Sequence, residues 1–540
     1  MTPRLLLVGL DAADADLIDR WCCEGVLPNI AMLKARGTSF RMRTTAETFH
    51  VSAWPSLFTG VAPDHHGLYH AYVTRPGHQG LLRPRPDESP VPVFWKLLSD
   101  RGLRSVVMDA FLTCPVQGLH GVQIVDWGTW SWFWEPTTVP GSLGREIRQR
   151  FGPYPSEDHS KIGMTPVTDI AGFRAGLLAA VARKTDVVRW LMASEPWDLF
   201  LVIFSESHPA GHYFWHLHDP SYPTHPDDGA GALAHALRDV YVALDEAVGA
   251  LVGSLDDRTT VLLVSGDGMG PNYSGSHILA PLLVRMRALA TADAGPGEGA
   301  AGGAHAGRTD LLRAVRNMIP QSTRIAISQA VLSRQTQERL ALRWKTAGIA
   351  WPATRAFVIE NANEGYLRVN LQGREPQGRV SPGREYDDLC DELCRAARSM
   401  VNPATGRPCA RSVHKIADVC RGPFRDHLPD VVITWDPDAR VTTELLTDKY
   451  GLVRAPEPAW RVPPFYSGNH WPNAFAVAAG PGVPEGLALD PPSILDIAPT
   501  ILEGFGIEPP AYMPGQVLDG LRIGTGSASG APRDRQQDAR

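Results

Sequence analysis

Cysteine is scarce in this sequence, with seven residues in a chain of 540. An odd count in a chain that starts directly with a core-like strand argues against a disulfide framework. Cys22 and Cys23 are adjacent, and Cys390 and Cys394 lie four residues apart in a helix-like segment. Neither pair has partners at the spacing of a zinc site, so we expect buried structural thiols without a chemical role.

The sequence also lacks a dominant charge of one sign and a long hydrophobic run. The formal net charge is -6 and the basic residues are dispersed, which gives no electrostatic footprint for a nucleic-acid polymer or an anionic membrane. No uninterrupted apolar segment reaches the roughly 18 to 20 residues that span a bilayer. We therefore expect a soluble, cytoplasmic protein that acts on a small molecule, and any recognition of phosphate must be local.

With 44% hydrophobic and 20% charged residues, the chain can bury a large core. Strand-like runs alternate with helix-length patterns, and the pattern at 15–35 has Gly37 well placed to end it. The strand-like runs are residues 5–10, 105–108, 123–126, 197–204 and 259–264, and a second helical pattern covers 173–193. This alternation predicts an α/β fold with a doubly wound, mostly parallel sheet flanked by helices.

Composition divides the sequence into four parts. Residues 1–289 and 353–523 are expected to form the N-terminal and C-terminal parts of one α/β domain, with strand-like patterning at 357–371. Residues 290–352 between them begin with a Gly/Ala-rich stretch and continue as helical patterns, which predicts a flexible loop and a helical cap insertion. The polar tail 524–540 is expected to be disordered.

Carboxylates and histidines stand next to several of these strand-like runs. The carboxyl ends of parallel strands meet at one edge of a sheet, so such residues can converge there although they are distant in sequence. His208 and His212 lie four residues apart, a spacing that lets one helical turn direct both imidazoles to one metal. The residues in such positions are Asp11, His208, His212, Asp267 and His470. The pattern predicts a metal-dependent enzyme.

Further motifs add to this set. The block Ser52-Ala-Trp-Pro-Ser-Leu-Phe-Thr-Gly60 leads to His66-Gly67, and Gly468-Asn-His470 precedes Gly480-Pro-Gly482. Residues 364–376 and 494–502 extend the likeness, which runs from residue 1 to about 518. In order and spacing the sequence resembles the alkaline phosphatase superfamily, and within it the type I phosphodiesterase and nucleotide pyrophosphatase branch.

The resemblance implies an alkaline phosphatase-like fold and a metal-dependent hydrolase of phosphoesters, of the phosphodiesterase or nucleotide pyrophosphatase type, that acts by in-line displacement. It implies one or two divalent metal ions per chain, with zinc expected and manganese or iron as alternatives. Carried over by position, one metal would take His208, His212 and His470, and the other would take Asp11, Asp267 and the nucleophile.

The sequence departs from the family pattern in both metal sites. An Asp of the first site is replaced by His208, and the Asp-His pair of the second is replaced by Gly266-Asp267. A site of three imidazoles still suits zinc, iron or manganese. His277 could replace the missing ligand, although a histidine in a surface loop is the more common interpretation.

A third departure concerns the nucleophile, which is Thr or Ser in the family. The aligned position is His50, which could bind metal or form a phosphoramidate, with Ser52 and Thr48 as alternative hydroxyl groups. For Ser52 and Thr48 the competing interpretation is local capping of the following helix.

Two residues are candidates for substrate binding. Asn272 follows Gly268-Met-Gly-Pro, and Arg374 lies in Gly-Arg-Glu-Pro, where a structural salt bridge is the more common role. The aromatic segment 127–134 could line a pocket for a ring-bearing substrate or pack under a loop.

Three other functions stay open on the same scaffold. The first is another ester class, namely a sulfatase, a phosphomonoesterase or a phosphotransferase. The second is a degenerate member that binds metal or ligand without catalysis. The third is an enzyme with a single metal at His208, His212 and His470.

Overall fold

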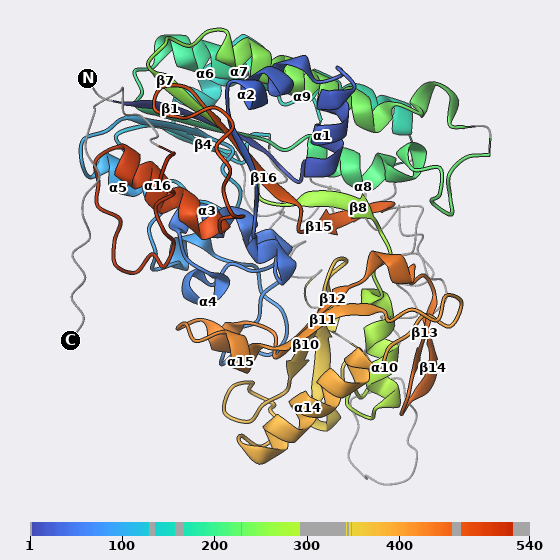
Figure 1. Cartoon of the computed structure of the whole chain (residues 1–540). Coiled ribbons are helices and arrows are strands. Elements are labelled where there is room, and N and C mark those ends of the chain that lie inside the picture. The colour runs from blue at the N-terminus through green and yellow to red at the C-terminus, as the bar shows by residue number, and fades with distance from the viewer. Residues whose placement is uncertain are drawn as a thin grey trace.

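The computed structural model describes residues 3–128, 136–156, 167, 169–227, 229–291, 342, 345, 346, 348–455 and 466–521 (Figure 1). In these residues the chain forms an eight-stranded sheet, a smaller four-stranded sheet and two pairs of strands. The predicted flexible loop, most of the helical cap insertion, the C-terminal tail and most of the aromatic segment 127–134 lie outside the described residues.

The large sheet has a parallel centre with antiparallel strands at both sides. Its core strand β1 pairs in parallel with β6 and β7, and β6 continues in parallel to β3 and β4. In spatial order the strands are β2 (Gly37–Met42), β16 (Ala474–Ala479), β7 (Thr259–Ser265), β1 (Arg4–Leu10), β6 (Leu199–Phe204), β3 (Ser105–Met108), β4 (Gly121–Val125) and β5 (Thr137–Val139). The prediction of a mostly parallel sheet flanked by helices is confirmed.

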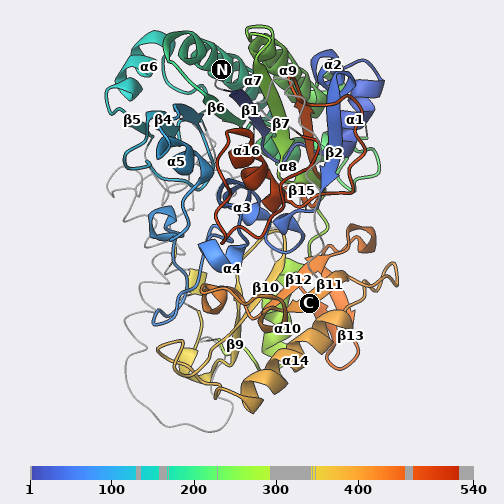
Figure 2. The same ribbon diagram turned by 60° about the vertical axis from the view of Figure 1, so that its left-hand side comes forward.

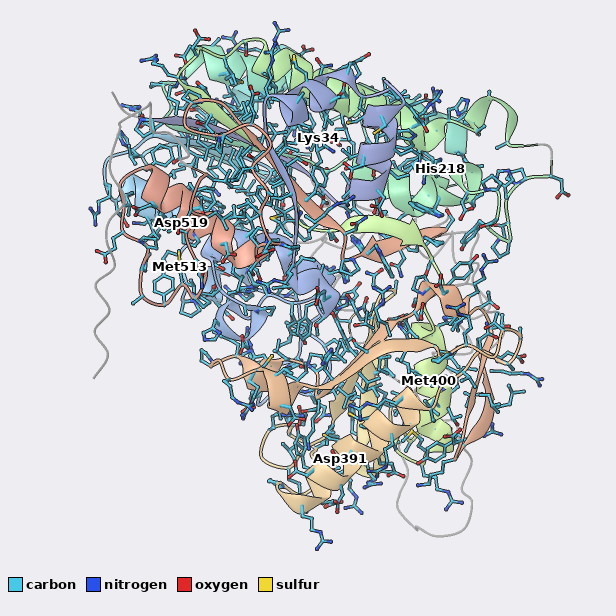
Figure 3. The ribbon with its side chains drawn as sticks, in the orientation of Figure 1. Lys34, His218, Asp391, Met400, Met513 and Asp519 are labelled. Carbon is cyan, nitrogen blue, oxygen red and sulfur yellow. The ribbon has the colours of Figure 1, made fainter. Side chains whose placement is uncertain are left out.

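Helices cover both faces of this sheet, so its central strands are buried on both sides. One face packs against α1 (Ala15–Cys23), α2 (Pro28–Ala35), α6 (Leu143–Phe151), α7 (Ile170–Ser194), α8 (Ser207–His218) and α9 (Ala236–Val252). The other packs against α3 (Ala53–Thr59), α5 (Phe94–Ser99) and α16 (Ile497–Gly504), which Figure 2 shows in front of the sheet. Met513 belongs to this second layer, and Figure 3 shows its side chain beside α16.

The single helix predicted over residues 15–35 is wrong, because two helices occupy this range. α1 ends at Cys23, Gly25 has a positive φ of 74°, and Pro28 starts α2, where its missing N–H is tolerated. Gly37 does not cap a helix but begins strand β2. A turn with its own proline and glycine therefore overrides the continuous helical pattern.

The smaller sheet is entirely antiparallel and lies at the carboxyl end of the large one (Figure 1). Its strands are β11 (Ala410–Lys415), β12 (Val431–Trp435), β10 (Gly365–Val369) and β9 (Ala356–Ile359). Helices α10 (Leu279–Arg285) and α14 (Arg384–Arg398) pack on it with Met400, labelled in Figure 3. Residues 353–523 thus supply strands to both sheets, and the domain boundaries drawn from the sequence stay a prediction.

The remaining strands and short helices connect these bodies. Strand β8 (Gly268–Pro271) pairs with β15 (Gly468–Trp471) between the two sheets, as Figure 1 shows. The others are β13 (Glu444–Thr447), β14 (Gly451–Arg454), α4 (Pro63–His66) and α15 (Ile416–Val419). Among the described helices, none has both the length and the apolar composition that crossing a bilayer requires. All seven cysteines have free thiols. Cys390 and Cys394 are buried as expected, but Cys23 is exposed and Cys22 is only partly buried, so the expectation of buried thiols is wrong for that pair.

Candidate metal centre

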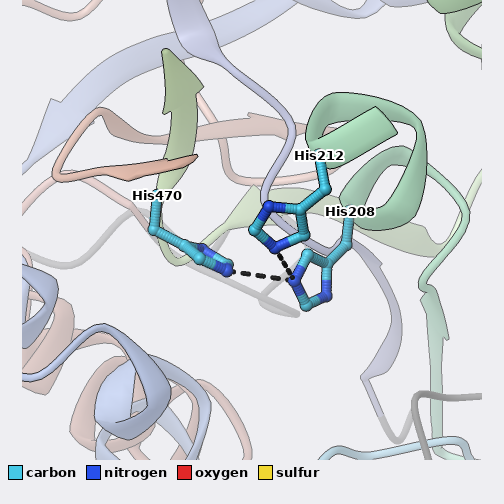
Figure 4. Close-up of side chains that lie close together, drawn as sticks. All are labelled: His208, His212 and His470. Atoms are coloured by element: carbon cyan, nitrogen blue, oxygen red, sulfur yellow. Dashed lines mark hydrogen bonds between the residues drawn. The ribbon is translucent and has the colours of Figure 1, made fainter. Parts of the chain in front are cut away.

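Three histidines converge beyond the carboxyl end of the large sheet. His208 and His212 lie one turn apart on α8, which follows β6, and His470 lies on β15. The Nε2 atom of His208 lies 2.9 Å from Nε2 of His212 and 3.0 Å from Nε2 of His470 (Figure 4). In the part of the chain that the structure describes, this is the one group of three potential ligands whose donor atoms all lie within 4.8 Å of one another.

The opposite nitrogen of each ring faces a hydrogen-bond acceptor. Nδ1 of His208 lies 3.1 Å from Oδ2 of Asp11, and Nδ1 of His470 lies 2.6 Å from Oδ2 of Asp267. Nδ1 of His212 donates to the carbonyl oxygen of Gly468 at 2.8 Å. A carbonyl oxygen only accepts, so neutral His212 carries its proton on Nδ1 and a lone pair on Nε2. Acceptors behind the rings in this way are typical of metal-binding histidines.

The chemistry of this donor set fits a divalent cation. Burial lowers the pKa of His212 and of His470 well below the ordinary value for histidine, and the neighbouring histidines lower both further. The rings of His212 and His470 are therefore neutral at physiological pH, and neutral imidazole is the form that binds zinc. Lone pairs that face one another at about 3 Å repel, and a cation between them would remove this repulsion.

Asp11 is held from both sides at the end of β1. Its Oδ1 accepts a hydrogen bond of 2.7 Å from Nε1 of Trp54, while its Oδ2 faces His208. Gly9 makes room for this indole, because a Cβ on Gly9 would lie 2.6 Å from the Trp54 ring. Ser207 fixes the start of α8 by donating to the backbone oxygen of Asp11 at 2.7 Å.

Asp267 lies among other acidic groups and has little contact with solvent. Burial raises the pKa of Asp267 well above its ordinary value, and the charges of Asp11 and Glu364 raise it further. A bound cation would favour the ionised form of this carboxyl group.

A buried lysine fixes the segment before α8. Nζ of Lys184, on α7, lies 3.1 Å from Asp109 and 3.5 Å from Glu206, and the three side chains are fully buried. Lys184 also donates to the backbone oxygen of Ile203 at 3.0 Å, and Tyr154 donates to Glu206 at 2.6 Å. The cluster ties the end of β6 to α7 just before α8 begins.

The structure offers fewer ligands for a second metal than the family plan requires. Gly266 has no side chain, and a Cβ there would lie 2.9 Å from the Cβ of Ala53. Nε2 of His277 lies 2.6 Å from the backbone oxygen of Thr442, so this ring is engaged elsewhere. The residues at these positions do not fit a second ion of the family type.

Of the three candidate nucleophiles, His50 lies closest to this centre. Its ring lies against that of His470, with centroids 4.5 Å apart and the ring planes tilted by 32°. Ser52 is fully buried, and its hydroxyl donates to the backbone oxygen of Phe49 at 2.6 Å, as expected of a local structural role. Thr48 is half-buried at the end of the short helix Thr45–Glu47, and its backbone oxygen accepts from Tyr366.

The sequence-based list missed the residues that hold His50. Both oxygens of Glu364 contact the Nδ1 of His50, at 2.8 and 3.0 Å, and Asn363 Nδ2 lies 2.7 Å from its Nε2. The signal was the cluster Asn361-Ala-Asn363-Glu364 directly before an apolar strand, whereas Asp11 directly follows one.

The two candidate substrate-binding residues differ in their positions. Asn272 is near the centre, since its Oδ1 accepts from Asn469, the neighbour of His470, at 3.3 Å. Arg374 belongs to the smaller sheet, where its guanidinium binds Asp430 at 2.7 and 2.8 Å and Glu375 at 3.0 Å. The structure does not bring Arg374 together with the histidines, and its contacts favour the structural salt bridge.

Comparison with known proteins assigns the family. The family model for type I phosphodiesterase / nucleotide pyrophosphatase matches residues 5–459. No curated protein matches the sequence. Similar solved structures include two of phosphonoacetate hydrolase from Sinorhizobium meliloti 1021, in complex with phosphonoformate (13% identity) and with phosphonoacetate (12% identity). Each has a TM-score of 0.46 and covers 92% of this chain and 94% of that one.

The sequence match places the protein among the phosphoester hydrolases. Within that class, the chain belongs to the type I phosphodiesterase/nucleotide pyrophosphatase family. The resemblance identified from the sequence is confirmed.

Proposed function

We propose that the protein is a metal-dependent hydrolase of phosphodiesters or nucleotide-like pyrophosphates. The observation that carries this proposal is the convergence of three Nε2 atoms beside His50, at the sheet edge of a chain in this family. The family match supports hydrolysis of a phosphoester, and the imidazole cluster supports its dependence on a metal.

His208, His212 and His470 would hold one divalent ion, and zinc suits neutral imidazole best. Such an ion supplies positive charge that polarises the phosphoryl group and stabilises the transition state. Asp11 and Asp267 belong to the centre as the acceptors behind His208 and His470. This arrangement favours one ion per chain over the two that the family plan implies.

His50 is the proposed nucleophile. Its Nε2 would attack phosphorus, so that a P–N bond forms while the bond to the leaving oxygen breaks and that oxygen takes a proton from water. A water molecule would then attack phosphorus and release its proton to solvent. The P–N bond breaks in this second step, and its electron pair returns to Nε2.

The first test is metal content and turnover of the full chain, purified without chelator. We expect inductively coupled plasma mass spectrometry to give one divalent metal per chain, together with hydrolysis of bis-p-nitrophenyl phosphate. Parallel assays with p-nitrophenyl phosphate and p-nitrophenyl sulfate test the phosphomonoesterase and the sulfatase. Metal without turnover of any ester would overturn the proposal in favour of a binding protein.

The nucleophile is tested by substitution. His50→Gln should abolish turnover at unchanged metal content, and the wild-type protein quenched during turnover should carry an acid-labile, base-stable adduct. Ser52→Ala is the matched variant on the same short helix. Loss of turnover in Ser52→Ala, with activity retained in His50→Gln, would assign the attack to the serine.

A further inference from the structure

The fully buried carboxylate of Glu364 makes more contacts to His50 than to any other residue. It touches His50 twice, at the ring through Nδ1 and at the backbone, where the N–H of His50 donates to Oε1 at 3.1 Å. Asn361 donates from Nδ2 to Oε2 at 2.6 Å. All three groups can act as donors to the carboxylate, which satisfies a buried negative charge.

These contacts decide which nitrogen of His50 carries the proton. A carboxylate oxygen only accepts hydrogen bonds, so the Nδ1 that faces it must be protonated. In neutral His50 the lone pair is then on Nε2, and the amide of Asn363 donates to it at 2.7 Å. The ring is thus held with Nε2 away from Glu364, and it lies against the ring of His470 with the two planes tilted by 32°.

Glu364 comes from a different part of the fold than His50. It directly precedes β10 of the smaller sheet, whereas His50 starts the short helix His50–Ser52 before α3 of the large domain. The hydroxyl of Ser276 binds the backbone oxygen of Glu364 at 2.9 Å and accepts from Nε1 of Trp435 at 2.9 Å, which anchors this corner of the smaller sheet. The segment before β10 of the smaller sheet therefore supplies the carboxylate that contacts His50.

We propose that Glu364 is the positioning residue of His50, which fixes Nδ1 as the protonated nitrogen and leaves the lone pair on Nε2, where the reacting phosphorus would replace the amide of Asn363. It also stabilises the positive charge on the ring once Nε2 forms its bond to phosphorus, because Nδ1–H and the carboxylate then form an ion pair. The part of this inference that concerns the attack on phosphorus rests on the proposed function, whereas the assignment of the His50 tautomer does not. The role corresponds to that of a carboxylate behind a catalytic imidazole.

The test compares Glu364→Gln with Glu375→Gln in the full chain. Glu375 is a matched control, because it is also a buried glutamate next to the smaller sheet, but it pairs with Arg368 and Arg374. Selective ¹⁵N-histidine labelling, with His50→Gln to assign the signals, reports the tautomer. We expect the Nδ1–H form in the wild type and in Glu375→Gln, and a mixture of tautomers in Glu364→Gln.

Kinetics gives the second readout. At equal metal content, we expect kcat for bis-p-nitrophenyl phosphate to fall by about 100-fold or more in Glu364→Gln while KM changes little. Glu364→Asp should recover part of the loss, since it restores the charge. An unchanged tautomer and an unchanged kcat in Glu364→Gln would overturn the inference. If the wild type has no turnover but the tautomer responds to Glu364→Gln, the proposed function fails and the positioning of His50 stands.

Discussion

Oδ2 of Asp267 lies 2.6 Å from Nδ1 of His470, on the side of the ring that faces away from the other two histidines. An aspartate that the family resemblance assigns to a second metal therefore contacts a histidine that is proposed to bind the first. The same relation holds between Asp11 and His208. It places a carboxylate behind two of the three imidazoles, where each orients its ring and would balance the charge of a bound cation.

The first prediction follows from this contact. Asp267→Asn keeps the shape of the side chain but removes its charge, so we expect the affinity for zinc to fall by about 10- to 100-fold while one ion per chain still binds at saturation. Competition with a chromophoric chelator measures the affinity, and Asp256→Asn, an exposed surface change, is the control. If Asp267→Asn binds no zinc at all, Asp267 is a direct ligand.

The second prediction distinguishes His212 from His216, which lie one turn apart on α8. His212→Ala removes an Nε2 atom from the centre and should abolish stoichiometric zinc binding. His216 lies one turn further on, where its Nδ1 contacts Ser467 at 3.0 Å, and His216→Ala should retain the metal. Metal analysis after dialysis checks both, and equal metal content in the two variants would contradict the three-histidine centre.

The third prediction concerns Arg374. Because its guanidinium is buried against Asp430, Arg374→Met leaves this carboxylate without its main partner and should lower the free energy of unfolding by about 3 to 5 kcal/mol. Urea denaturation measures this change. Any folded fraction should bind substrate with unchanged KM, and a large rise in KM at wild-type stability would restore Arg374 as a substrate-binding residue.

The fourth prediction is a pH dependence of stability from His66, which is 1% exposed. Burial lowers the pKa of His66 to about 3, and its Nδ1 accepts the backbone N–H of Leu68 at 3.0 Å. The unfolded chain takes up a proton near the ordinary pKa of about 6.5 and the folded chain does not, so stability falls as pH drops from about 6.5 towards 3.

The slope from this one group reaches at most about 1.4 kcal/mol per pH unit. Urea midpoints between pH 7 and pH 4 should show a shallower decline for His66→Gln than for the wild type. His65→Gln, a change at the exposed neighbour, controls for the substitution itself. The same slope in all three proteins would show that His66 is not the group responsible.

The sequence by itself predicted the parallel centre of the large sheet and the three histidines that are proposed as metal ligands. Continuous apolar runs such as Leu199–Phe204 can only be strands buried on both faces, and parallel strands bring the residues that follow them to one edge. The spacing of His208 and His212 predicts that both imidazoles lie on one face of a helix, as they do on α8. Gly25 and Pro28 also indicate the break between α1 and α2, but the helical pattern continues across them, and the sequence therefore predicted a single helix.

The tertiary structure alone decided what surrounds these ligands. Glu364 and His50 are 314 residues apart in sequence, and they meet because the smaller antiparallel sheet is placed at the carboxyl end of the large one. The pairing of oxygens with nitrogens depends on this packing and on the rotation of each ring. The spacing of residues in the sequence predicts neither of the two. Sequence therefore specified the donor atoms, and only the packing of the two sheets specified their hydrogen-bond partners.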